Sequence, residues 1–231
     1  MTKPGLTFAD YQETKPRHFH AVLDEWLARA ASPPRRLGWT AMATGHADGD
    51  EHVSARLPEH IAGTRLVIRR WRVEDAEPLS RLIEASLTHL RPWMAWAAEE
   101  PMPIEQRRRL IEHWDRYWET GDGVVYGIFE RAAPVGGCGL HRRIGPGGLD
   151  LGYWIGADHT GRGLATETAR QLTTAAFETD DIDHVEINHE RSNTASAAVA
   201  RRLGYAGIRR EPDDSTDVMG WRVDRTDWLA R

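Results

Sequence analysis

A short glycine-containing turn offers the clearest chemistry in the 231-residue sequence. The turn, Thr160-Gly161-Arg162-Gly163-Leu164-Ala165, follows the strand-like run LDLGYWIG and opens the helix-like run LATETARQLTTAAF. A helix N-terminus offers free backbone N–H groups and the positive end of the helix dipole, and both favour a bound phosphate. The turn therefore predicts a phosphate-bearing ligand, although an ordinary helix start in which glycine eases the turn gives the same pattern.

Three phosphate ligands compete for this turn. A nucleotide-binding P-loop requires a lysine after its second glycine, and the turn contains no lysine. A dinucleotide-binding turn requires a third glycine, whereas Gly161-Arg162-Gly163 is followed by Leu164-Ala165-Thr166. Coenzyme A, which carries a pyrophosphate, is the remaining candidate.

The regular part of the chain begins near Leu57 and contains the elements that must position this turn. Hydrophobic spacing predicts helices over residues 75–87, 103–119 and 194–203. It predicts further strands over residues 65–71, 124–130, 135–143, 184–189, 205–210 and 218–223. Because helices are grouped early and strands are grouped in the middle, we expect an α+β fold with a mixed sheet.

Residues 1–55 differ from the rest and predict an N-terminal extension that precedes one domain over residues 56–231. Within the extension, residues 18–31 have helical spacing, and Ser32-Pro33-Pro34 ends that helix.

Bulk composition narrows the class of protein. The net charge of −5 argues against a nucleic-acid partner. No apolar run approaches the roughly 18 residues of a membrane span, and no secretory signal is visible, so we expect a cytoplasmic protein without a membrane partner. Cys138, the single cysteine, is expected to be a buried small hydrophobe, and we expect no metal. Residues 107–109 are expected to form a solvated helix face.

The order of elements, together with LDLGYWIGADHTGRGLATETA and SNTASAAVARRLGY, resembles the GNAT superfamily of acyl-CoA-dependent N-acetyltransferases. HIAGTRL, RPWM and GYWI are similar to its Rim-type branch, the ribosomal-protein alanine and serine acetyltransferases. The resemblance extends from about Leu57 to Trp228. It implies a central, mostly antiparallel mixed sheet that is splayed at the cofactor site and flanked by helices, and it implies acetyl-CoA as cosubstrate.

The resemblance assigns the coenzyme to three segments. The turn at residues 160–165 wraps the pyrophosphate with backbone N–H groups, and Arg162 either adds charge or is a solvated loop arginine. The pantetheine arm pairs with backbone atoms of Trp154, Ile155 and Gly156, and an N–H near Ile155 polarises the thioester. Asn193 contacts the pantetheine, caps the following helix, or does both.

The resemblance also implies catalytic residues. Asp150 is the first candidate for the general base that takes the amine's proton, and by period two it shares a face with Gly152 and Trp154. Glu186 is the second candidate, and each could instead be an ordinary exposed strand carboxylate. Ser196 is predicted to stabilise the departing thiolate, because Ala200 stands where many members carry a proton-donating tyrosine. The predicted acceptor contacts are Trp93, Trp96 and Asn188.

These features predict direct transfer of acetyl to a primary amine, in a small molecule such as an aminoacyl compound or antibiotic, or at a protein N-terminus. A small molecule is slightly preferred, because the extension could help to close the site. The alternative is a non-catalytic acyl-CoA-binding regulatory module, since Thr160 and Ala200 depart from the family pattern. The oligomeric state, including a homodimer, stays open.

Overall fold

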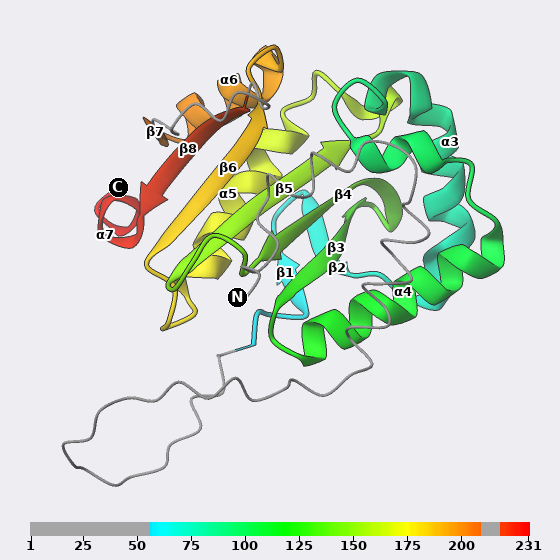
Figure 1. Ribbon diagram of the computed structural model, residues 1–231, viewed down its shortest axis with the longest axis horizontal. Helices are drawn as coiled ribbons and strands as arrows, with labels where there is room; N and C mark the ends of the chain where they lie inside the picture. Colours follow the sequence, from blue (N-terminus) through cyan, green and yellow to red (C-terminus); the bar gives the residue numbers. More distant parts are fainter. Residues whose placement is uncertain (1–55, 209–217) are drawn as a thin grey trace, which may run out of the picture.

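The computed structural model describes residues 56–208 and 218–231 of the chain. Within these residues, one eight-stranded sheet runs in the order β1-β2-β3-β4-β5-β6-β8-β7 (Figure 1). The strands are β1 (His60–Ala62), β2 (Leu66–Arg70), β3 (Gly123–Glu130), β4 (Ala133–His141), β5 (Gly148–Ile155), β6 (His184–Glu190), β7 (Ala206–Ile208) and β8 (Val218–Asp224). The helices are α3 (Ala76–Leu90), α4 (Ile104–Glu119), α5 (Leu164–Phe177), α6 (Thr194–Arg202) and α7 (Arg225–Leu229), with short 3-10 turns at η1 (Val73–Asp75), η2 (Ala95–Glu99) and η3 (Ala157–His159).

Strands β5 and β6 form the parallel pair in this otherwise antiparallel sheet. Their pairing covers only residues 148–150 and 184–186, although β5 continues to Ile155 and β6 to Glu190. The two strands therefore diverge beyond Asp150 and Glu186, as Figure 1 shows. The expected mixed, mostly antiparallel sheet flanked by helices is confirmed.

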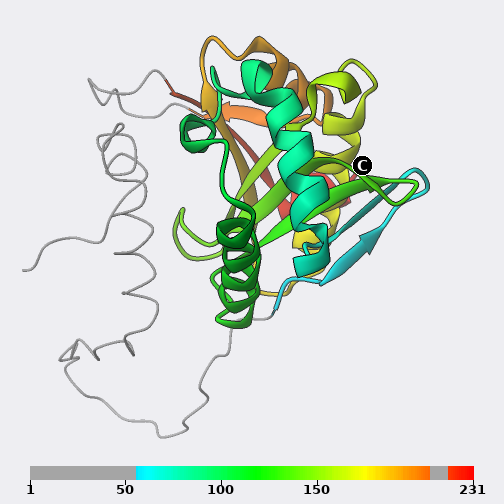
Figure 2. The ribbon, with the colours of Figure 1, turned by 90° about the vertical axis from the view of Figure 1, so that its right-hand side faces the viewer.

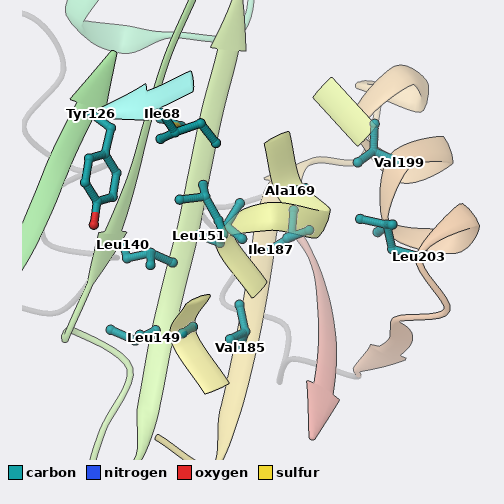
Figure 3. Packing of buried hydrophobic residues seen from close by; sticks show 14 of the residues in the cluster. Ile68, Tyr126, Leu140, Leu149, Leu151, Ala169, Val185, Ile187, Val199 and Leu203 are labelled. Carbon is teal, nitrogen blue, oxygen red and sulfur yellow. The ribbon is translucent and has the colours of Figure 1, made fainter. Parts of the chain in front are cut away.

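Helices cover both faces of the sheet. Helices α5 and α6 pack against one face, and α3 and α4 pack against the other, nearest the viewer in Figure 2. The alternation of side chains along β5 decides which residues each layer receives. Leu149, Leu151 and Ile155 belong to the large core under α5, and Figure 3 shows Leu149 and Leu151 of this core together with Ala169 of α5. Trp154 instead packs with the smaller cluster under α3 and α4.

The α3 and α4 layer contains a buried ion pair that corrects one expectation. Arg107 was expected on a solvated helix face, but its side chain is only 2% exposed and donates to Glu100 Oε1 at 2.5 Å. Its Nε also donates to Ser80 Oγ at 3.3 Å. Nothing in the spacing of the three consecutive arginines distinguishes Arg107 from its neighbours. Its pairing with Glu100, in the loop between α3 and α4, therefore could not be predicted from the sequence.

Most predicted elements are found within about three residues of their expected ends. The structure adds β1 and α7, whose three and five residues are too short for a periodic pattern to reveal. The helix predicted over residues 18–31 lies outside the described residues. Among the helices of the described part of the chain, none is long and apolar enough to cross a membrane.

Candidate active site

The predicted phosphate turn lies at the start of α5, with open surroundings. Gly161 and Gly163 have φ angles of +72° and +78°, a left-handed conformation that glycine adopts without strain. Among residues 56–208 and 218–231, a Cβ built on either glycine meets nothing within 4 Å, so the backbone conformation rather than crowding requires glycine here. No side chain of the described residues caps α5 at Gly163. The first N–H groups of α5 are therefore available to an anion.

The side chains of the turn divide between core and surface. Leu164 is buried in the large core, and Ala165 packs against its edge, so both can offer the ligand their backbone N–H groups. Thr160 donates its hydroxyl to Ala157 O at 2.9 Å, inside the turn itself.

Arg162 belongs to a charged cluster beside the turn. Its guanidinium donates to both oxygens of Glu130, at 2.9 and 2.7 Å. Arg65 donates to the same carboxylate at 2.8 Å and to the carbonyl oxygen of Arg162 at 3.0 Å. These hydrogen bonds lower the pKa of Glu130. Two guanidinium groups share one carboxylate, which leaves a net positive charge next to the turn.

The divergence of β5 from β6 exposes one backbone edge of β5. The N–H of Gly156 donates to Val135 O on the β4 side at 2.9 Å. Because alternate residues of a strand point their N–H and C=O groups to the same side, those of Leu151, Tyr153 and Ile155 point towards β6. The last pair of the β5–β6 ladder, Asp150 with Glu186, uses the N–H of Leu151, so β6 pairs with neither Tyr153 nor Ile155. Of the three residues predicted to pair with pantetheine, Ile155 is thus the one whose N–H faces the divergence.

Two hydroxyl groups meet on the α5 and α6 side of this edge. Tyr153 Oη lies 2.9 Å from Ser196 Oγ, in the first turn of α6. Asn193 caps that helix, because its Oδ1 accepts the Ser196 N–H at 3.0 Å. Ala200 is fully buried in the core behind them. Burial raises the pKa of Tyr153 to about 12, so it stays protonated.

Sequence reasoning missed Tyr153. It shares a face with Leu151 and Ile155, and that pattern indicates core packing. The available signal was chemical: a tyrosine at a buried position must find a partner for its hydroxyl.

Asp150 lies on the opposite face of β5, where it is only 4% exposed. Arg143 donates to Asp150 Oδ2 from Nε at 2.7 Å and also from Nη2. Asn188 of β6 donates to Asp150 Oδ1 at 2.9 Å. The structure therefore brings Asp150 and Asn188 together across the point where the strands diverge. Glu186, 7% exposed, pairs in register with Asp150 on β6.

His141 is a second polar group of this face that the sequence did not suggest. Tyr117 Oη lies 3.1 Å from both the carbonyl oxygen of Asp122 and His141 Nδ1. A carbonyl only accepts, so the Tyr117 proton goes to Asp122 and Nδ1–H donates to Tyr117. The other ring nitrogen, Nε2, then carries a lone pair. Burial, helped by nearby Arg143 and opposed by Asp150, lowers the pKa of His141 to about 4.

Two glycines without side chains leave space on the α3 and α4 face of β4 and β5. Gly139 and Gly152 lie opposite each other on β4 and β5. A Cβ on Gly139 would come within 2.7 Å of His141 Nε2, so the imidazole lies over that glycine. A Cβ on Gly152 would meet no atom of the described residues within 4 Å. The space above Gly152 is therefore flanked by one carboxylate, Asp150, and one neutral imidazole, His141.

The two tryptophans predicted to contact the acceptor lie in different surroundings. Trp96, in η2, contacts Trp154 with ring centroids 5.8 Å apart. Trp93 lies in the turn after α3 and is 37% exposed. The loop that carries both is fastened by the buried Arg107–Glu100 pair and by Arg91, which donates to Ala97 O at 3.4 Å.

A family model described as acetyltransferase (GNAT) domain matches residues 65–206, more than half of the chain. YdaF of Bacillus subtilis (strain 168), which carries the name ribosomal N-acetyltransferase, is 29% identical over 153 residues, covering 66% of this chain and 81% of YdaF.

Two solved structures share the fold. RimL, a ribosomal L7/L12 alpha-N-protein acetyltransferase in complex with coenzyme A, has a TM-score of 0.64 at 22% identity over 72% of this chain and 98% of its own. The microcin C7 self-immunity acetyltransferase MccE, in complex with acetyl-CoA and AMP, has a TM-score of 0.63 at 19% identity over 70% of this chain and 93% of its own. The chain therefore belongs to the GNAT acetyltransferase family and is an N-acetyltransferase that uses acetyl-CoA.

Proposed function

We propose that the protein transfers acetyl directly from acetyl-CoA to an unhindered primary amine that approaches from the α3 and α4 side of β5. The observation that carries this proposal is the division of β5 into two faces. Its unpaired edge and the turn before α5 suit the coenzyme, whereas Asp150 and His141 suit an amine.

The coenzyme fits the first side because its charge and its chain both find partners there. The free N–H groups of α5 and the positive cluster of Arg162 and Arg65 hold the pyrophosphate. The unpaired edge of β5 accepts the pantetheine amides as an added strand would. The Ile155 N–H polarises the thioester carbonyl and stabilises the oxyanion that forms on it.

On the second side, Asp150 accepts the proton that the amine must lose. Arg143 and Asn188 hold its carboxylate in place, and the unprotonated His141 Nε2 accepts a further hydrogen bond from the amine, directly or through one water. Glu186, in register with Asp150, is the second candidate for the base.

Direct transfer is favoured over a covalent enzyme intermediate by the state of the single cysteine. Cys138 is 6% exposed within the large core, and burial raises the pKa of its thiol well above its ordinary value. A thiol in this state is a poor nucleophile, because the thiolate is the reactive form.

The space above Gly152 beside the Asp150 carboxylate suits an unhindered primary amine. The names of YdaF and RimL favour the α-amino group of a protein N-terminus as the first acceptor to test. MccE has a TM-score close to that of RimL, so small-molecule amines are also tested as acceptors.

The experiment incubates the enzyme and acetyl-CoA with a panel of peptides and small amines and identifies acetylated products by mass spectrometry. Asp150→Asn should lower kcat by about 10²- to 10⁴-fold, the usual contribution of a general base, without weakening coenzyme A binding. Asp227→Asn, an exposed carboxylate of α7, is the control and should retain full activity. A panel in which no amine is acetylated by the unchanged enzyme would overturn the proposal.

A further inference from the structure

The hydroxyl of the half-buried Tyr153 makes a different kind of contact from the hydroxyls of the buried tyrosines Tyr126 and Tyr205. Tyr126 donates to the carbonyl oxygen of Pro58 at 2.5 Å. Tyr205 bonds Thr173 at 2.6 Å, and Thr173 in turn donates to Ala169 O at 2.6 Å. Both chains of hydrogen bonds therefore end at a backbone carbonyl, which only accepts.

The chain that starts at Tyr153 has no such end. Tyr153 Oη bonds Ser196 Oγ at 2.9 Å, and within the part of the chain that the structure describes no carbonyl accepts from either hydroxyl. A phenol is the more acidic of the two groups, so Tyr153 donates and Ser196 accepts. The proton of Ser196 is left to point to a third partner.

The location of Ser196 indicates that partner. Ser196 stands in the first turn of the nine-residue helix α6, whose N-terminus favours a nearby negative charge. Tyr153 belongs to the unpaired edge of β5, two residues before Ile155, whose N–H faces the divergence. The hydroxyl pair therefore adjoins the place that the proposed function gives to the thioester.

We propose that Tyr153 is a positioning residue that directs the Ser196 hydroxyl towards the sulfur of the coenzyme and so stabilises the thiolate as it leaves. This inference rests on the proposed function, which places the thioester beside β5. In the step concerned, the amine nitrogen forms a bond to the acetyl carbon and the C–S bond breaks. The sulfur keeps the electron pair and accepts the Ser196 hydrogen bond, and Asp150 takes the amine's proton.

This arrangement replaces a donor that the chain lacks. Ala200 offers no donor, and the Cys138 thiol is buried in the core. Ser196, in the first turn of α6 and directed by Tyr153 of β5, supplies the missing hydrogen bond in place of a donor at position 200. Its raised pKa keeps Tyr153 a donor throughout the working pH range.

The first test measures the pKa of the coenzyme A thiol bound to the enzyme, from the ultraviolet absorbance of the thiolate. Tyr153→Phe should raise that pKa, because the hydrogen bond to the thiolate becomes weaker, while the Kd of coenzyme A stays within about twofold. Tyr205→Phe removes the same atom from a buried tyrosine of the same face and should leave the thiol pKa unchanged. An unchanged thiol pKa in Tyr153→Phe would overturn the inference.

The second test is a kinetic double-mutant cycle. Tyr153→Phe should lower kcat by about tenfold and Ser196→Ala by more, towards the 10²- to 10³-fold that a direct donor supplies. The double variant should match Ser196→Ala alone, because Tyr153 acts through Ser196. Independent, multiplying losses would contradict this role.

The two tests separate the inference from the proposed function. If no amine is acetylated but the thiol pKa responds to Tyr153→Phe, the proposed function fails and the hydroxyl pair is retained. If amines are acetylated and the thiol pKa does not respond, the inference fails alone.

Discussion

The two faces of the sheet are stabilised and equipped in different ways. Under α5 and α6, apolar side chains fill a continuous core, and the polar groups that reach β5 are the neutral hydroxyls of Tyr153 and Ser196. Under α3 and α4, a smaller apolar cluster is joined by charged groups, among them Arg107 with Glu100 and Asp150 with Arg143. A departing thiolate needs hydrogen-bond donors, whereas an amine needs acceptors. The face that builds the core is therefore also suited to the leaving group, and the face that tolerates charge is suited to the acceptor.

The largest expected effect tests the charged layer. Arg107→Met should reduce the free energy of unfolding by about 3–5 kcal/mol, because it leaves Glu100 buried without its cation. Denaturant unfolding measures this. Arg108→Met is the matched control, since Arg108 makes a 2.5 Å pair with Glu105 on the surface and should cost at most about 1 kcal/mol. Equal losses in the two variants would mean that burial of charge does not distinguish this layer.

The next effect tests the apolar layer. Leu151→Ala should cost about 2–5 kcal/mol, because Leu151 is 2% exposed and the core cannot close fully around the cavity. Leu229→Ala, at a leucine that is 68% exposed on α7, should change stability by less than about 0.5 kcal/mol. A loss below about 1 kcal/mol for Leu151→Ala would show that the core repacks easily.

A pH-dependent effect tests the acceptor face. The pKa of His141 is about 4 in the folded protein and 6.5 ordinarily, so between these pH values the unfolded chain binds the extra proton. The stability contributed by neutral His141 is present above pH 6.5 and is lost as the pH falls towards 4, by up to roughly 3 kcal/mol.

His141→Gln should therefore make unfolding less sensitive to pH across that window, as measured by denaturant titrations at several pH values. His89→Gln, at an exposed histidine of α3, should keep the slope of the unchanged protein. Parallel slopes for all three proteins would refute a His141 that stays neutral in the folded protein.

The smallest effect on stability compares two glycines of the α3 and α4 face, Gly152 and Gly137. Gly152→Ala should change the free energy of unfolding by less than about 0.5 kcal/mol, because its Cβ enters open space. It should raise the KM for the amine several-fold while the Kd of coenzyme A stays constant. Gly137→Ala, whose Cβ would lie 2.6 Å from Trp154 Nε1, should instead destabilise the protein. An unchanged amine KM in Gly152→Ala would place the acceptor elsewhere.

The sequence predicted the local features of the fold, namely which residues of a strand share a face and where a turn requires glycine. Alternation along β5 separated Asp150, Gly152 and Trp154 from Leu151 and Ile155, because strand geometry fixes which side chains share a face. The two glycines of the turn before α5 were informative for a similar reason, since a left-handed φ is a local requirement.

The contacts between distant elements could not be predicted in this way. Tyr153 and Ser196 are 43 residues apart, and Tyr117 reaches His141 across 24 residues. Arg107 can be buried because the α3–α4 loop places Glu100 beside it. No feature of the three consecutive arginines predicts this contact. Periodicity assigns a residue to a face, but only packing decides which helix supplies its partner.

The three-residue pairing of β5 with β6 also affects the cooperativity of the whole sheet. Five strands lie on one side of this seam and three on the other, and the backbone ladder between the two groups is the shortest that β6 makes. A coenzyme that pairs along the unpaired edge of β5 would act as a replaceable strand of the fold. Saturation at a hundredfold excess over Kd would add about 2.7 kcal/mol to the free energy of unfolding. The amides of Tyr153 and Ile155 would then change from fast to slow hydrogen exchange, so the substrate would complete the hydrogen bonding of its own enzyme.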